Sequence, residues 1–210
     1  MPGHILLAVC LALAGLALGW VQRPLISRFV PGSGPSALVT GGVTALLFLL
    51  LGTRVHGGFV PGALCALAMI AVPLAVIDVA EQRLPNQLTA AAYAVIAGGL
   101  LLAAAVGDHW HDMARAALGG LALAGFYLLL AVISPAGMGL GDVKLAASVG
   151  TALAWVSWRA LVLGGFAGFF FLALYSGAMM AAGRLGRKQY VPFGPFIIAG
   201  AFLLLVAMPA

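Results

Sequence analysis

Long apolar runs, separated by short polar segments, follow one another along the whole chain of 210 residues. A helix needs about 20 mostly apolar residues to cross a bilayer. Eight such segments are predicted, with ends defined to within a few residues. They cover roughly residues 4–22, 37–53, 58–80, 87–106, 113–133, 143–157, 160–182 and 194–208, and the sixth is short. The pattern predicts an all-α protein, a polytopic membrane helix bundle of about eight transmembrane helices.

Composition supports a membrane protein and leaves no room for a separate soluble domain. Hydrophobic residues make up 64% of the chain, charged residues only 7%, and the mean hydropathy is +1.16. A soluble domain carries about 25% charged residues. Residues 1–210 are therefore interpreted as a single transmembrane domain. The net charge of +5 does not indicate a nucleic-acid partner, because the basic residues stand at the ends of the apolar runs.

The basic residues also predict an orientation, since Lys and Arg concentrate in cytoplasmic loops. With the N-terminus outside, seven of the ten fall on the inner side and three on the outer side. The inner set is Arg23, Arg28, Arg83, Lys144, Arg184, Arg187 and Lys188, and the outer set is Arg54, Arg115 and Arg159.

Two acidic residues are the main candidates for chemistry. Asp78 ends the third apolar run, just before Arg83-Leu84-Pro85-Asn86. Asp142 lies in the glycine-rich segment Gly137–Lys144 that opens the sixth run. An ionisable group at a membrane boundary is costly and by default marks a functional site. The predicted topology places both carboxyls at the cytoplasmic face.

A pair of carboxyls can hydrolyse a peptide bond when one is ionised and takes a proton from water while the other donates one. Asp142 stands at the predicted start of a helix, with Lys144 close by, and both favour its ionised form. Asp78 stands near a helix C-terminus, which disfavours charge. We therefore predict Asp142 as the base and Asp78 as the acid. Taken singly, each also fits a plain structural role, as a helix cap or a solvated helix end.

Flanking residues are predicted to support this pair. Gly139 and Gly141 permit close approach of an extended substrate backbone. Pro85 ends the third span, and Asn86 or Thr89 is expected to cap the next helix. Gly194, within Pro192-Phe193-Gly194-Pro195, falls at the same predicted level near the C-terminus.

With these motifs the sequence resembles the type IV prepilin peptidases, a bacterial family of integral-membrane aspartyl proteases. That family has an aspartate seven residues before a proline in a Leu/Ile-Pro-Asn/Asp context, as Asp78 and Leu84-Pro85-Asn86 are here. Its Gly-x-Gly-Asp-x-Lys signature is matched by 139–144, and its late Pro-Phe-Gly-Pro element by 192–195. The resemblance extends over about residues 70 to 205.

The resemblance implies an aspartic endopeptidase of the bacterial inner membrane, with Asp78 and Asp142 as catalytic residues and no cofactor or metal. Its partners would be membrane lipid and prepilins or pseudopilins of type IV pili or protein secretion, whose basic leader it removes at the cytoplasmic face. Many relatives also methylate the new N-terminus through an insertion with paired Cys-x-x-Cys motifs. The segment Arg23–Ser36 is short and has no cysteine, so N-methyltransferase activity is not expected.

Other interpretations remain open at this stage. A signal-peptide-clearing intramembrane aspartyl protease also uses a Gly-x-Gly-Asp element, although the Arg83–Asn86 context argues against it. A proton-coupled transporter would place its carboxyls near the midplane of the membrane. The ligand-like run Asp108–Asp112 lies in a tight outer loop, where adjacent side chains rarely close a tetrahedral metal site.

Overall fold

The computed structural model describes residues 2–31, 34–55, 58–134, 137–184 and 191–208. These ranges hold eight helices and no strand. The helices are α1 Pro2–Ser27, α2 Ala37–Arg54, α3 Val60–Glu81, α4 Asn86–Gly107, α5 Trp110–Ile133, α6 Leu140–Val156, α7 Trp158–Ala181 and α8 Gly194–Ala207. The prediction of an all-α polytopic bundle is confirmed.

Six of these helices are long and apolar enough to cross a membrane: α1, α2, α3, α4, α5 and α7. The other two are shorter, with 17 residues in α6 and 14 in α8. The predicted ends differ by three residues or more at three places. Helix α5 begins at Trp110 instead of residue 113. Helix α1 continues to Ser27, five residues beyond the predicted end, with Pro24 inside its last turn. Helix α6 begins at Leu140 instead of residue 143, which places Asp142 inside its first turn.

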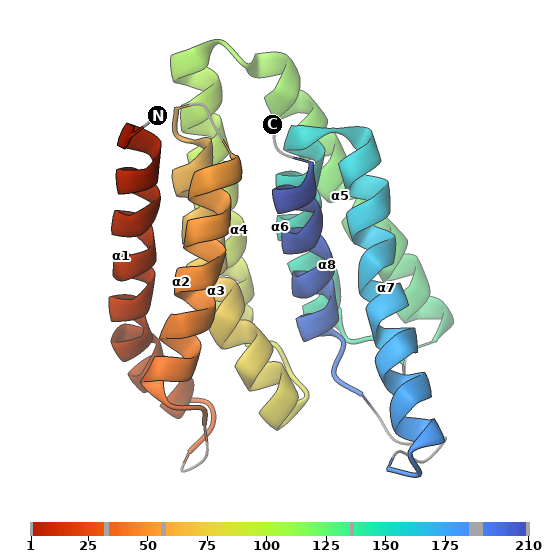
Figure 1. The fold of residues 1–210 in the computed structure, drawn as a ribbon. Coiled ribbons are helices and arrows are strands. Elements are labelled where there is room, and N and C mark those ends of the chain that lie inside the picture. The colour runs from red at the N-terminus through yellow and green to blue at the C-terminus, as the bar shows by residue number, and fades with distance from the viewer. Residues whose placement is uncertain (1, 32–33, 56–57, 135–136, 185–190, 209–210) are drawn as a thin grey trace.

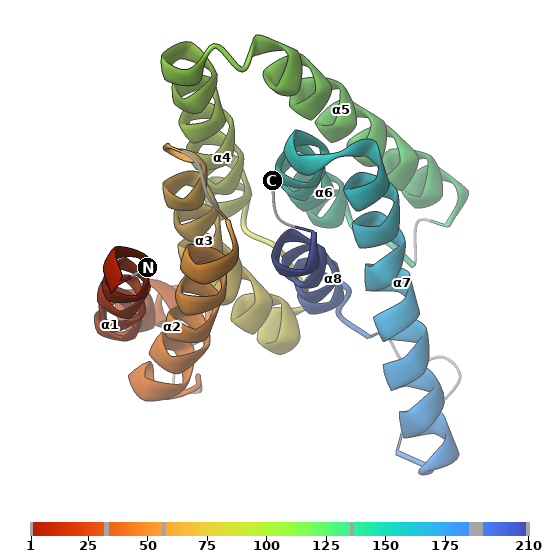
Figure 2. The ribbon, with the colours of Figure 1, turned by 45° about the horizontal axis from the view of Figure 1, so that its top comes forward.

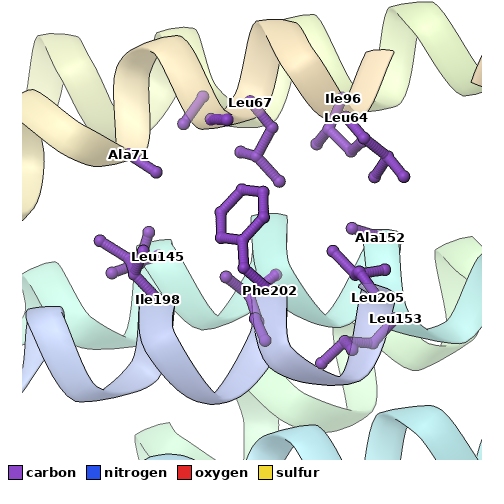
Figure 3. Close-up of a cluster of buried hydrophobic side chains, with 14 of the residues drawn as sticks. Leu64, Leu67, Ala71, Ile96, Leu145, Ala152, Leu153, Ile198, Phe202 and Leu205 are labelled. Carbon is purple, nitrogen blue, oxygen red and sulfur yellow. The ribbon is translucent and has the colours of Figure 1, made fainter. Parts of the chain in front are cut away.

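The helices form two groups, α1–α4 and α5–α8, that lie side by side (Figures 1 and 2). Their interface is built by α3 and α4 on one side and by α6 and α8 on the other. Figure 3 shows this apolar interface, in which Leu64, Leu67 and Ile96 face Ala152, Phe202 and Leu205. The buried core therefore lies between the part of the chain that carries Asp78 and the part that carries Asp142.

Glycines allow the closest contacts within each group. A Cβ on Gly19 would lie 2.2 Å from the Ala37 carbonyl oxygen, and one on Gly15 would lie 2.8 Å from the Ala45 Cα. A Cβ on Gly168 would lie 3.1 Å from the Ile197 Cα. Such spacing lets helix backbones approach where lipid provides no hydrophobic force between helices.

The helices alternate in direction, so the C-terminal ends of α1, α3, α5 and α7 lie at one end of the bundle (Figure 1). The start of α6 and the start of α8 lie at the same end. Asp78, near the end of α3, and Asp142, in the first turn of α6, are therefore on the same side. The predicted parity of the helices agrees with this arrangement.

At the opposite end, Arg115 joins α5 to α6. Its Nε donates to the Ala154 carbonyl at 2.6 Å, and one terminal nitrogen donates to the carbonyls of Trp155 and Val156. Asp112 pairs with the other terminal nitrogen at 2.9 Å. Arg115 thus binds carbonyl groups at the C-terminal end of α6, which have no partners within the helix and carry partial negative charge.

Replacing Arg115 with methionine is expected to destabilise the bundle by about 2–3 kcal/mol, because buried carbonyls lose hydrogen bonds from a charged donor. Thermal unfolding in detergent measures the effect. Arg159→Met is the control, since Arg159 lies at the same end of the bundle with an exposed side chain. Equal losses in the two variants would contradict this role for Arg115.

Candidate active site

The two predicted catalytic aspartates are buried at one end of the helix bundle. Asp78 is 3% exposed and Asp142 is 4% exposed. They come from the two helix groups, one from α3 and the other from α6. Both lie at the end of the bundle where α3 ends and α6 begins (Figure 1). The structure therefore places two acidic groups from widely separated parts of the sequence at the same end of the bundle.

Asp78 is held in the last turn of α3. The helix stops after Glu81 because Gln82 takes the left-handed conformation, with φ 51° and ψ 36°. The Oδ2 of Asp78 accepts a hydrogen bond of 2.8 Å from the backbone N–H of Gly194, the first residue of α8. Asp78 therefore occupies the position of a capping acceptor for α8.

Asp142 accepts a comparable bond from its own segment. Its Oδ2 takes the backbone N–H of Gly139 at 3.1 Å. Gly139 is the N-cap residue of α6 and Asp142 is the third helical residue, so the carboxyl reaches back over the first turn. The interpretation of Asp142 as the N-cap itself is thus replaced by this arrangement.

The sequence predicts Asp142 at the positive end of one helix and Asp78 at the negative end of another, which would divide the roles of base and acid. The structure adds that Asp78 also faces the positive N-terminal end of α8 through Gly194. At Asp78 the favourable dipole of α8 therefore opposes the unfavourable dipole of α3, and helix dipoles on their own do not separate the two roles.

The segments around the two aspartates, 83–86 and 139–144, are also in contact with each other. The Lys144 Nζ donates to the Asn86 Oδ1 at 2.6 Å. A Cβ on Gly141 would lie 2.8 Å from the Leu84 Cβ, so Gly141 gives Leu84 the space to pack against it. The segment that ends α3 and opens α4 is thereby fixed against the start of α6.

The cap predicted for α4 was wrong. The N-cap residue is Pro85, with φ −62° and ψ 130°, and no side chain caps this end. Thr89 instead donates to the carbonyls of Pro85 and Asn86 at 3.4 and 3.1 Å. The side chain of Asn86 does not cap α4, because it binds Lys144, a residue from another helix.

Tyr127 is a further residue beside the site that the sequence analysis did not identify. It is fully buried on α5 and donates to the Gly165 carbonyl at 3.2 Å. Its ring stacks on Phe193 with centroids 5.7 Å apart, and Phe169 lies 4.7 Å from Phe193. These rings support the residue that precedes Gly194. The available signal was a phenol within an apolar run, because a buried Tyr hydroxyl needs a partner.

Together these features define a helical membrane protein with a buried pair of carboxyls at one end of its bundle. The sequence profile of the Type IV leader peptidase family matches residues 63–208. The chain belongs to this family of peptidases. The match contains Asp78, Asp142 and Gly194, and it leaves α1 and α2 outside.

Several relatives are identical to this chain at about a third of the aligned positions. A protein of Bacillus subtilis named prepilin leader peptidase/N-methyltransferase is 32% identical over 166 residues, which cover 77% of this chain and 62% of that protein. A protein of the same name from Aeromonas hydrophila is 31% identical over 176 residues, which cover 78% of this chain and 56% of that protein. The chain thus matches little more than half the length of these curated relatives. No solved structure matches it.

Proposed function

We propose that this protein is a membrane aspartic endopeptidase that removes the leader from prepilins or pseudopilins. The observation that carries the proposal is the buried pair Asp78 and Asp142, which come from separate helix groups and lie at the same end of the bundle. Membership of the Type IV leader peptidase family and the names of the relatives support the choice of substrate.

The proposed reaction needs one carboxylate and one carboxylic acid. The carboxylate takes a proton from water, whose oxygen attacks the scissile carbonyl carbon, and the acid donates a proton to the carbonyl oxygen. Two close carboxyls suit this task because they cannot both ionise cheaply. We retain Asp142 as the base and Asp78 as the acid, since Lys144 lies in the same helix turn as Asp142.

Charge distribution supports a cytoplasmic site with the N-terminus outside, in what we propose to be the bacterial inner membrane. Among the described residues, Arg23, Arg28, Arg83, Lys144 and Arg184 lie at the end of the bundle that carries the aspartates. Arg54, Arg115 and Arg159 lie at the other end. Arg187 and Lys188 lie outside the described residues. The excess of basic residues at the first end favours that end as the cytoplasmic one.

The proposal covers the peptidase step alone. The relatives' names also include N-methyl transfer, but the segment between α1 and α2 has no cysteine, and Cys10 and Cys65 both lie in helices. A proton-coupled transporter is not favoured, because both carboxyls lie in terminal turns of their helices and not at mid-span.

A cleavage assay tests the proposal. The purified chain in detergent or lipid vesicles would be mixed with a prepilin from the same genome, and mass spectrometry would show whether the leader is released. Cleavage after the basic leader supports the proposal. Equal cleavage of a substrate that lacks the basic leader would instead favour a signal-peptide-clearing protease. Proton flux without cleavage would favour a transporter.

Lys144→Met is expected to move the acidic limb of the pH–rate profile to higher pH. Loss of a positive charge close to Asp142 makes its ionised form less favourable, so the base is deprotonated only at higher pH. Lys144 forms no ion pair with Asp142 among the described residues and binds Asn86 instead. Asn86→Ala therefore serves as the control: it breaks this hydrogen bond and keeps the charge. An equal shift in both variants, or no shift in Lys144→Met, would contradict an electrostatic role.

A further inference from the structure

A proline interrupts the hydrogen bonding of the helix that carries Asp78. Pro73 lies inside α3, which nevertheless runs unbroken from Val60 to Glu81. Proline has no backbone N–H, so the carbonyl four residues earlier, that of Met69, loses its partner within the helix. In a membrane, an unpaired carbonyl costs several kcal/mol unless a neighbouring group supplies a donor.

The missing donor comes from another helix. The side-chain Nε2 of Gln22, on α1, donates to the Met69 carbonyl oxygen at 3.0 Å. The same nitrogen donates to the Thr44 hydroxyl of α2 at 2.9 Å, and Thr44 donates to the Thr40 carbonyl at 2.9 Å. Gln22 is only 2% exposed. A buried amide with both its hydrogens in use defines one geometry for the three helices.

The position of this contact connects it to the proposed active site. Pro73 precedes Asp78 by five residues, which is about 7.5 Å along a helix. Proline is a common origin of helix kinks, and the direction of the segment after it depends on what holds the freed carbonyl. The last turns of α3 therefore take their direction at the point where Gln22 binds.

We propose that Gln22 is a positioning residue for Asp78. Its side-chain amide replaces the backbone hydrogen bond that Pro73 cannot make, and so fixes the end of α3 on which Asp78 meets Gly194. The proposal rests on the proposed function for its activity readout. It also gives α1 a task in the peptidase, although α1 lies outside the residues that match the family.

A double-mutant cycle tests the proposal. Gln22→Leu removes the donor, and Pro73→Ala restores a backbone N–H for Met69. In the parent, Gln22→Leu is expected to lower kcat about tenfold and to change KM by less than about twofold. The loss in kcat is set below the about 100-fold that a 1 Å displacement of a reacting group can cost, because Gln22 acts on Asp78 only through α3. In the Pro73→Ala background, Gln22→Leu should lower kcat by less than about threefold. An equal loss in both backgrounds would overturn the proposal.

Thr44→Val is the matched control, because it removes the other partner of Gln22 and leaves the bond to Met69. We expect it to lower the thermal midpoint while kcat stays within about twofold of the parent. If Gln22→Leu likewise changed only the thermal midpoint, its role would be structural and the positioning role would be excluded.

A measurement without substrate separates this proposal from the proposed function. Spin labels at Val79 on α3 and Leu174 on α7, both exposed, report the direction of the end of α3 after Cys10 and Cys65 are replaced by alanine. Gln22→Leu should broaden the distance distribution, and Pro73→Ala should narrow it again. An unchanged distribution in Gln22→Leu would overturn the proposal even if the protein cleaves prepilins. If the parent cleaved no prepilin, the proposed function would be rejected, but the spin-label measurement would still test the role of Gln22.

Discussion

Asp78→Asn and Asp142→Asn are each expected to lower the rate of prepilin cleavage by about 10³-fold or more. Asparagine keeps the size and shape of aspartate, but its side-chain amide can serve neither as the base nor as the acid of the reaction. Proton transfer by one positioned group contributes about 10²–10⁴-fold. In Asp78→Asn, the amide oxygen of the new side chain can still accept the hydrogen bond from Gly194, so the contact between α3 and α8 is preserved. The rate should therefore fall without unfolding, which thermal denaturation in detergent checks.

Two other carboxyls supply matched controls. Glu81 lies one turn beyond Asp78 at the same end of the bundle, where it forms only a distant ion pair of 3.8 Å with Arg83. Asp112 lies at the opposite end. Glu81→Gln and Asp112→Asn should keep cleavage within about threefold of the parent. If either Asp78→Asn or Asp142→Asn kept a comparable rate, the pair could not be the source of the chemistry.

The helices were predictable from the sequence because a bilayer imposes a minimum apolar length on each of them. The errors concern their ends. Pro24 follows Arg23, a natural point to end a span, yet α1 continues through Pro24 to Ser27. Gly139-Leu140-Gly141 has the composition of a loop, yet Leu140 already belongs to α6, since the side chain of Asp142 satisfies the N–H of Gly139.

The candidate site was predictable as far as local motifs describe it. Asp78 and Asp142 stand out because ionisable groups are rare in this chain. Their partners are harder to find, since Gly194 lies 116 positions from Asp78 and Lys144 lies 58 from Asn86. Only the packing of α8 against α3 shows that a second helix dipole acts on Asp78. Gln22 is equally hard to find from the sequence, because its partner Met69 lies 47 positions away. The bond between them matters because Pro73 has no backbone N–H to donate to the Met69 carbonyl.

Gly194→Ala is expected to have the second-largest effect on activity. A Cβ at this position would lie 2.8 Å from the Asp78 Oδ2 and 3.3 Å from its Cγ. The Asp78 carboxyl must then move away from the N-terminus of α8 and out of its present relation to Asp142. A displacement of about 1 Å in a reacting group can cost about 100-fold in rate. We expect a loss of that size in kcat, measured with the same prepilin assay.

The backbone at Gly194 has no left-handed φ, so alanine fits its conformation, and alanine favours a helix by up to about 1 kcal/mol over glycine. Activity should therefore fall while thermal stability stays near that of the parent. Gly177→Ala, in α7, is the control because a Cβ there meets no atom within 4 Å.

Combining Gly194→Ala with Asp78→Asn gives the sharper test. If alanine acts by displacing Asp78, it should cost little more once that carboxyl is gone, because residues that act as a unit are not additive. A further loss of about 100-fold in the double variant would show that Gly194 acts on the reaction by another route.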